Sequence, residues 1–155
     1  MVENKAIKES KQRFQIFITK FIVIGDNNMK KLKIMIVEDE EDILILYKDY
    51  LASKGHEVIT TFLSGEDMIK EIDKINPDIY LIDYRLPGNK NGIDIAIEIL
   101  NKWPSASILF ITAYELLHKE ISKNSIFYGK NIQVLVKPVK LDKIESAALN
   151  LVNKN

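Results

Sequence analysis

The stretch Lys33-Ile-Met-Ile-Val-Glu-Asp-Glu40 decides the fold, because four consecutive apolar residues lead directly into three acids. A short apolar run rich in β-branched residues is typical of a strand that is buried on both faces. Such strands belong to parallel sheets that helices cover on both sides. The acids then mark the carboxyl end of the strand, where ligands bind in open α/β sheets.

Four further runs of similar length follow, and stretches of helical periodicity separate them. The expected strands are Lys33 to Val37, Glu57 to Phe62, Ile79 to Asp83, Ile108 to Thr112 and Gln133 to Val136. This alternation is typical of βαβ units and predicts one parallel sheet. All strands but the second are nearly continuous apolar runs, so we expect helices on both of their faces.

The intervening segments predict helices with recognisable ends. The first helix has its apolar residues at helical spacing, namely Ile43, Leu46, Tyr47, Tyr50 and Leu51, and Gly55 supplies a stop. Ser64 with Asp67 resembles a capping pair for the second helix. A third helix is expected at Gly92 to Lys102 and a last one at Leu141 to Val152. The segment from Glu115 to Ile126 is the least regular, because its apolar residues form no clean stripe.

Composition excludes several classes of protein. A chain of 155 residues is too short for two large domains, and 22 basic residues balance 22 acidic ones, so no charge excess favours direct nucleic acid binding. The chain has no cysteine, which excludes disulfides and thiol chemistry and favours a cytoplasmic location. The longest apolar stretch, Phe14 to Ile24, is interrupted by Lys20 and is shorter than the roughly 20 residues of a membrane span. We therefore expect no membrane insertion.

Two regions are expected, because the polar residues Gly25 to Asn28 resemble a linker ahead of the first strand. Residues 1–29 are interpreted as an N-terminal extension, either a flexible or misassigned leader or, alternatively, a docking arm. Residues 30–155 are predicted to form the folded domain.

Side chains that could take part in catalysis or metal binding lie at the carboxyl ends of the predicted strands. The first strand ends in Glu38-Asp39-Glu40, the third in Asp83, the fourth in Thr112 and the fifth in Lys137. Crowded carboxylates repel one another and either raise a pKa or recruit a cation. Mg²⁺ suits such a site, because it prefers oxygen ligands together with a substrate phosphate. An aspartate can then act as the nucleophile of phosphoryl transfer, while a metal ion and a lysine neutralise the transferred oxygens.

Four motifs at these strand ends resemble the receiver domain of two-component response regulators. They are Ile34-Met-Ile-Val-Glu-Asp-Glu40, Asp78-Ile-Tyr-Leu-Ile-Asp-Tyr-Arg-Leu-Pro-Gly88, Ile108-Leu-Phe-Ile-Thr-Ala113 and Val134-Leu-Val-Lys-Pro138. The resemblance covers about residues 30 to 152 and implies a doubly wound, flavodoxin-like α/β fold. It implies five parallel strands in the order 2-1-3-4-5 and a cis peptide before Pro138.

The resemblance also implies a role for each matching residue. Asp83 would accept the phosphoryl group. Glu38, Asp39, Asp83 and the backbone carbonyl of Arg85 would bind Mg²⁺, with Glu38 acting through water. Thr112 and Lys137 would contact the phosphoryl group. Arg85, Ala113 and Tyr114 would tune access to it.

Several positions depart from the family pattern. The loop Asn89-Lys-Asn-Gly92 is one residue longer than usual, and the segment between Thr112 and Lys137 is about three residues longer. The aromatic residue that normally reports phosphorylation is replaced by Val134. The family's usual output route is therefore in doubt.

The leading hypothesis is a stand-alone receiver, since the 18 residues after Lys137 suffice for a closing helix only. It would receive its phosphoryl group from a histidine kinase or histidine phosphotransfer protein. It would then signal by binding an unknown downstream protein or serve as a phosphorelay intermediate. It would not be an enzyme beyond phosphorylating itself from a donor and dephosphorylating itself. Two alternatives stay open: a constitutive, receiver-like interaction module, and a flavodoxin-like enzyme, which the missing glycine-rich phosphate loop disfavours.

Overall fold

The computed structural model describes residues 7–16 and 30–154, which fall into two units, Met1–Lys30 and Lys31–Asn155. In the first unit, residues 7–16 form a helix whose side chains are all exposed. The rest of the predicted extension, 1–6 and 17–29, lies outside the described residues, as does most of the apolar stretch at Phe14 to Ile24. The interpretation of residues 1–29 as a leader or docking arm therefore stays a prediction.

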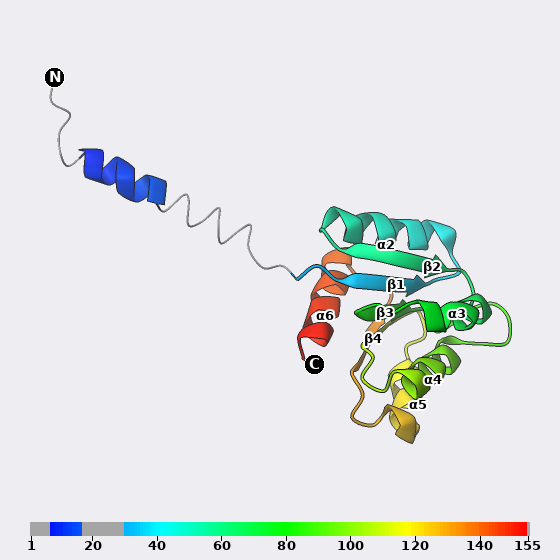
Figure 1. Ribbon diagram of the computed structural model, residues 1–155. Coiled ribbons are helices and arrows are strands. Elements are labelled where there is room, and N and C mark those ends of the chain that lie inside the picture. The colour runs from blue at the N-terminus through cyan, green and yellow to red at the C-terminus, as the bar shows by residue number, and fades with distance from the viewer. Residues whose placement is uncertain (1–6, 17–29, 155) are drawn as a thin grey trace. The chain divides into compact units, whose positions relative to one another are not determined.

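The second unit is built on a parallel sheet of five strands in the order β2-β1-β3-β4-β5, which confirms the predicted fold (Figure 1). The strands are β1 (Lys33–Val37), β2 (Glu57–Phe62), β3 (Ile79–Ile82), β4 (Ile108–Thr112) and β5 (Ile132–Val136). The chain order reverses beside β1, between β1 and β3, so the loops that follow these two strands diverge. A ligand site is expected at such a switch point.

Helices cover both faces of the sheet, because successive residues of each central strand point to opposite sides. Ile34 and Ile36 pack in one core cluster, whereas Met35 and Val37 pack in the other. The first core includes residues of α2 (Glu41–Ser53) and α6 (Leu141–Asn153). The second includes residues of α3 (Gly65–Glu71), α4 (Gly92–Lys102) and α5 (Leu117–Lys123).

The helix ends follow the local chemistry of the sequence. The Ser64 hydroxyl accepts the Asp67 N–H at 3.3 Å, as the predicted capping pair requires. Asn91 and Asp94 form a reciprocal capping box at the start of α4, which satisfies two backbone donors at once. Gly55 follows α2 with a positive φ of 88°, which confirms it as the stop.

Two details of the sequence interpretation are wrong. Leu46 was assigned to the buried stripe of α2, yet its side chain is 51% exposed. β5 is an edge strand whose residues are mostly half-buried, so helices do not cover both of its faces fully.

The segment expected to be irregular is short and broken. It folds as α5, of seven residues, followed by a 3-10 turn (Ser125–Phe127). Asn124 caps that turn by accepting the Ile126 N–H. Its buried residues are Leu117 and Phe127, and the partly buried Ile121 and Ile126 pack against the same core.

A buried polar network joins β1, α2 and α6 at the amino ends of the strands. His56 is 5% exposed, and its Nδ1 accepts the Leu32 N–H at 3.2 Å. Its other ring nitrogen, Nε2, therefore carries the proton and donates to Glu145 at 3.1 Å. The Tyr50 hydroxyl donates to the second oxygen of Glu145. The histidine thus has a structural role.

Replacing His56 with Ala is expected to destabilise the domain by about 2–3 kcal/mol, because it leaves the buried Leu32 N–H without its acceptor and Glu145 Oε1 without its donor. Urea unfolding followed by circular dichroism measures this. His118→Ala is the matched control, since His118 is exposed. Equal stabilities of the two variants would contradict the structural role of His56.

Among the described residues, none of the helices is both long enough and apolar enough to span a bilayer.

Candidate functional site

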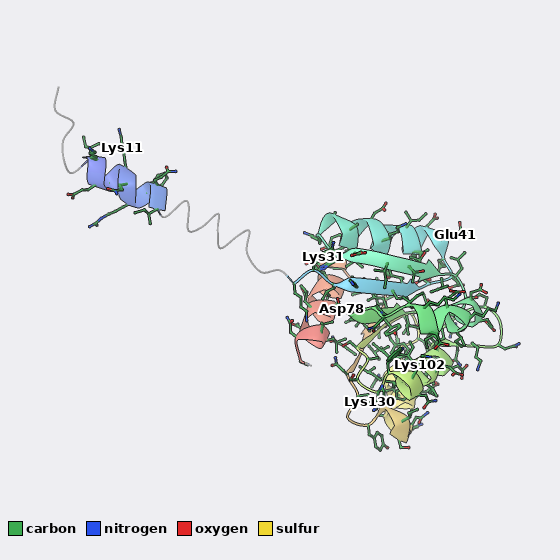
Figure 2. The ribbon with its side chains drawn as sticks, viewed as in Figure 1. Lys11, Lys31, Glu41, Asp78, Lys102 and Lys130 are labelled. Atoms are coloured by element: carbon green, nitrogen blue, oxygen red, sulfur yellow. The ribbon has the colours of Figure 1, made fainter. Side chains whose placement is uncertain are left out.

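The carboxyl ends of the central strands bring the predicted site residues to one edge of the sheet. In Figure 2, Glu41 at the start of α2 marks this edge of the sheet, and Lys31 and Asp78 mark the opposite edge. Glu38 and Asp39 directly follow β1, and Asp83 directly follows β3. The two strands are paired neighbours, so the carboxylates they carry converge.

Three carboxylates form the centre of the site. One oxygen each of Glu38, Asp39 and Asp83 lies within 4.8 Å of the others. Glu38 and Asp83 are buried, and Asp39 is exposed to solvent. This cluster of hard oxygen donors, with one side open to water, fits a hydrated Mg²⁺ ion.

Lys137 connects two of these carboxylates from the end of β5. Its Nζ donates to Glu38 Oε2 at 2.9 Å and to Asp83 Oδ2 at 3.3 Å. The peptide bond that joins it to Pro138 is cis, as predicted. The structure therefore places one ammonium group between two buried acids.

The protonation of this cluster is a balance of burial and charge. Burial raises the pKa of Glu38, against the hydrogen bond from Lys137 and the N–H of Glu40. Burial lowers the pKa of Lys137, but its hydrogen bond to Glu38 and the charges of Asp83 and Glu38 outweigh the effect of burial, so the net shift is upward. Lys137 therefore stays charged at neutral pH.

An open cavity of about 280 Å³ lies over these residues. It is lined by Asp39, Glu40, Asp83, Arg85, Thr112, Ala113 and Lys137. All the predicted site residues except Glu38 and Tyr114 therefore border one space. The volume is enough for a phosphoryl group together with a hydrated ion.

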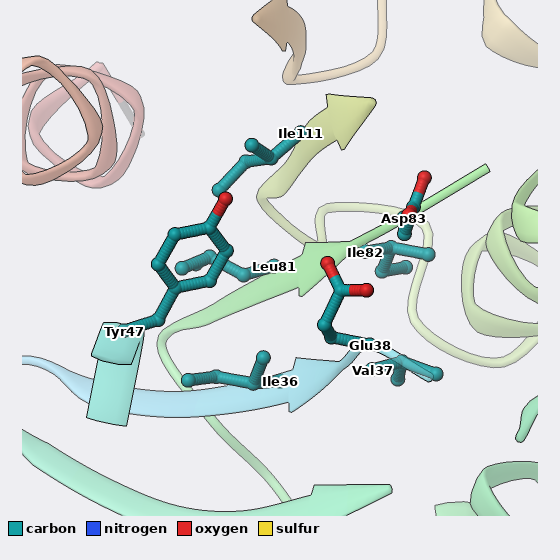
Figure 3. Close-up of a pocket in the computed structure, with 8 residues that line it drawn as sticks. All are labelled: Ile36, Val37, Glu38, Tyr47, Leu81, Ile82, Asp83 and Ile111. Atoms are coloured by element: carbon teal, nitrogen blue, oxygen red, sulfur yellow. The ribbon is translucent and has the colours of Figure 1, made fainter. Parts of the chain in front are cut away.

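A second, mainly apolar pocket shares Asp83 with this cavity and is drawn in Figure 3. Glu38 and Asp83 stand at the ends of neighbouring strands, and Tyr47 extends from α2 across the sheet toward Ile111. Burial raises the pKa of the Tyr47 phenol. The sequence interpretation assigned Tyr47 only to the core and did not foresee its place beneath the carboxylates.

The loop after β3 is fixed at both of its ends. The Arg85 N–H donates to Asp83 Oδ1 at 3.3 Å, and the Gly92 N–H donates to the Tyr84 carbonyl at 2.8 Å. Glu66 on α3 accepts the Asn89 N–H at 2.6 Å, and this hydrogen bond from the backbone lowers the pKa of Glu66. The sequence interpretation missed Glu66, because the two partners are 23 positions apart.

Thr112 is fully buried at the end of β4, and its hydroxyl accepts the Tyr114 N–H at 3.2 Å. The Tyr114 ring stacks on that of Tyr84, with centroids 4.9 Å apart. The Arg85 guanidinium lies 5.6 Å from the centroid of the Tyr114 ring. The residues that were expected to tune access therefore form one group beside Asp83.

The family is decided by a match of the response regulator receiver domain to residues 34–149. The chain belongs to this family. The match begins at β1 and includes every strand and the site residues described above. The predicted membership of the receiver family is thereby confirmed. The acidic cluster of Glu38, Asp39 and Asp83 is typical of the phosphoryl-accepting site of receiver domains.

Sequence relatives include both long and short receiver proteins. The chain is 31% identical over 111 residues to a protein-glutamate methylesterase/protein-glutamine glutaminase of Paramagnetospirillum magneticum, and the match covers 71% of this chain but 31% of that protein. The chemotaxis protein CheY of Listeria monocytogenes is 26% identical, with 75% of this chain and 94% of CheY covered. The receiver thus spans under a third of the methylesterase and nearly all of CheY.

Solved receiver structures share the fold. The receiver domain of a modulated diguanylate cyclase from Desulfovibrio desulfuricans matches with a TM-score of 0.69 and 24% identity, covering 81% of this chain and 96% of that domain. The response regulator TrrA of Thermotoga maritima, solved with Mg²⁺ and beryllium fluoride, matches with a TM-score of 0.64 and 28% identity. That match covers 79% of this chain and 99% of TrrA.

Proposed function

We propose that this receiver is a phosphorylation-controlled switch that accepts a phosphoryl group on Asp83. One observation carries the proposal: the Asp83 carboxylate borders the open cavity while lying within reach of Glu38, Asp39 and the Lys137 ammonium group. A nucleophilic carboxylate beside an ammonium group and a cation site has what phosphoryl transfer requires.

The transfer step uses residues that the cavity brings together. An oxygen of Asp83 attacks phosphorus and forms a new P–O bond, while the P–N bond of a phosphohistidine donor breaks and leaves its electron pair on the imidazole. Lys137, 3.3 Å from Asp83, is positioned to neutralise an oxygen of the transferred group. The Thr112 hydroxyl, at the border of the same cavity, is positioned to donate a hydrogen bond to another.

Glu38, Asp39 and Asp83 would hold the magnesium ion, together with the Arg85 carbonyl. Bound Mg²⁺ would supply charge neutralisation at the phosphoryl oxygens. The complex of the related TrrA with Mg²⁺ and beryllium fluoride supports this assignment. Lys137 donates to Glu38 at 2.9 Å and to Asp83 at the longer distance of 3.3 Å, so Asp39 and Asp83 are the better candidates for direct ligands.

The proposed phosphoryl donor is a histidine kinase or a histidine phosphotransfer protein, and the output is binding to a downstream protein. A Borrelia burgdorferi CheY has been solved in a complex with CheX, which illustrates that receivers dock other proteins.

Magnesium dependence tests the proposed chemistry. The full chain is incubated with acetyl phosphate and Mg²⁺, and intact mass spectrometry reads the covalent adduct. We expect one phosphoryl group with Mg²⁺ and none with excess chelator, and Asp39→Ala is expected to slow the reaction by at least about 100-fold. An adduct that forms equally well with chelator would contradict the magnesium role.

The second candidate is a constitutive interaction module that never turns over phosphate. Val134 favours it, because an apolar residue occupies the position of the usual aromatic reporter. The adduct measurement separates the two functions, since a constitutive module forms no adduct with or without Mg²⁺.

Arg85 and Tyr114 are expected to slow spontaneous hydrolysis of the phosphorylated protein, because Arg85 borders the cavity and lies over the Tyr114 ring. Replacing both with Ala is predicted to shorten the lifetime of the adduct by about 10-fold, as water gains access to phosphorus. The decay of the adduct after removal of the phosphodonor measures it. A matched double variant, Lys140→Ala with Lys119→Ala, changes exposed residues only. An unchanged adduct lifetime in the Arg85 and Tyr114 double variant would contradict the role of these residues in slowing hydrolysis.

A further inference from the structure

Two tyrosines of the site meet on one carboxylate of α5. Tyr84 directly follows Asp83, and Tyr114 lies two positions after Thr112. The Tyr114 hydroxyl donates to Glu120 Oε1 at 2.6 Å, and the Tyr84 hydroxyl donates to Glu120 Oε2 at 3.3 Å. The rings are nearly parallel, with an interplanar angle of 18°. Glu120 thus accepts a hydrogen bond from each tyrosine on a separate oxygen.

This tyrosine–glutamate cluster (Tyr84, Tyr114 and Glu120) is bonded to the site at two points. Tyr84 is covalently attached to Asp83. Tyr114 donates its backbone N–H to the Thr112 hydroxyl, the group that would hydrogen-bond the phosphoryl oxygens. Asp83 and Thr112 are therefore each connected to Glu120 through one tyrosine, by covalent bonds and hydrogen bonds.

From these contacts we propose that the tyrosine–glutamate cluster is the relay that carries the phosphorylation state of Asp83 to α5. The proposal rests on the proposed function and adds the route by which the site is read. Val134 is apolar and has no hydrogen-bonding group, so it cannot take part in such a relay.

The relay has a definite switching step. To bind a phosphoryl oxygen, the Thr112 hydroxyl moves into the cavity and away from the Tyr114 N–H. The backbone of Tyr114 follows or finds a new acceptor, because leaving a half-buried amide unpaired is unfavourable. Its ring then shifts against Tyr84, and the 2.6 Å hydrogen bond to Glu120 is broken or moved.

The receiving element is suited to respond. α5 has seven residues, and Leu117 is its only fully buried residue. Short elements with few buried contacts open at low free energy. The hydrogen bond to Glu120 raises the pKa of Tyr114, and burial raises that of Tyr84, so both phenols remain donors at neutral pH. Releasing Glu120 frees α5 from its polar connection to β3 and β4.

Hydrogen exchange of the full chain tests the relay. Amide exchange in residues 114–123 is compared with and without Mg²⁺ plus beryllium fluoride, a stable mimic of the phosphoryl group. In wild type we expect faster exchange with the mimic. In Glu120→Ala the difference is expected to shrink by about twofold or more, because α5 is already released. Tyr84→Phe, which keeps the ring and removes one hydroxyl, is expected to act in the same direction with a smaller effect.

Matched controls isolate the relay from charge and packing. Glu115→Ala removes an exposed acid of the same segment, and Tyr128→Phe removes a hydroxyl from an exposed ring. Both are expected to respond as wild type does. Glu120→Gln, which retains one acceptor oxygen, is expected to restore part of the response. Glu120→Met, which keeps the length of the side chain without a carboxylate acceptor, is expected to respond as Glu120→Ala does, whereas a loss of packing alone would leave Glu120→Met close to wild type.

The outcomes separate the relay from the proposed function. If intact mass shows no adduct from acetyl phosphate in wild type, the proposed function and the relay both fail. If wild type forms the adduct but exchange in 114–123 does not change with the mimic, the relay alone is overturned. The relay is also overturned if Glu120→Ala and Tyr84→Phe respond as wild type does.

Discussion

Replacing Lys137 with Met is expected to tighten Mg²⁺ binding by about 10-fold and to slow phosphoryl uptake by at least about 100-fold. The two effects are opposite because Lys137 binds Glu38 and Asp83 directly, at 2.9 and 3.3 Å. Without the ammonium group, Mg²⁺ no longer competes with Lys137 for the carboxylates of Glu38 and Asp83. The same change removes the positive charge that would stabilise the transferred phosphoryl group.

Isothermal titration measures the affinity for Mg²⁺, and intact mass spectrometry follows uptake from acetyl phosphate. Lys140→Met is the control, because Lys140 is exposed, three positions along the chain. An uptake rate equal to that of wild type would contradict the role of Lys137. Weaker metal binding in Lys137→Met would show that the lysine supports the metal site instead of competing with it.

Replacing Gly92 with Ala is expected to destabilise the domain by about 3 kcal/mol and to disturb the site. A Cβ on Gly92 would lie 2.5 Å from the Asp83 carbonyl oxygen and 2.8 Å from the Tyr84 Cα. Both contacts are with backbone, so no side chain can move to relieve them. The loop that begins at the phosphoacceptor must shift as a whole.

Gly129→Ala is the matched control for this substitution. Gly129 has a positive φ of 69° and nothing within 4 Å of the added carbon, so its expected cost is about 1 kcal/mol from backbone strain alone. Urea unfolding compares the two variants. If Gly92→Ala is no less stable than Gly129→Ala, the close approach of α4 to Asp83 is wrong.

Much of this fold could be predicted from residues that are close together in the sequence. The alternation of Ile34, Met35, Ile36 and Val37 between the two cores needs only a strand with apolar residues on both faces. The strand ends could likewise be predicted, because each acid or lysine of the site directly follows an apolar run. The convergence of Glu38, Asp83 and Lys137 then follows from a parallel sheet.

The remainder depends on partners far apart in the chain. His56 and Glu145 are 89 positions apart, and Tyr84 and Glu120 are 36 apart, so no spacing in the sequence connects them. Leu46 has the spacing of a core residue, but α2 is rotated so that it faces solvent. Leu116 and Leu117 are chemically identical, and only the packing of α5 decides which is buried.

Asp83 as the phosphoacceptor is the central claim, and mapping the phosphoryl group tests it most directly. Wild type, Asp83→Asn and Asp49→Asn, an exposed aspartate of α2, are incubated with acetyl phosphate and Mg²⁺ and then compared by intact and peptide mass spectrometry. We predict one phosphoryl group in wild type and in Asp49→Asn, on the peptide that contains Asp83, and none in Asp83→Asn. An adduct that persists in Asp83→Asn, or one that maps to Asp39, would contradict the account.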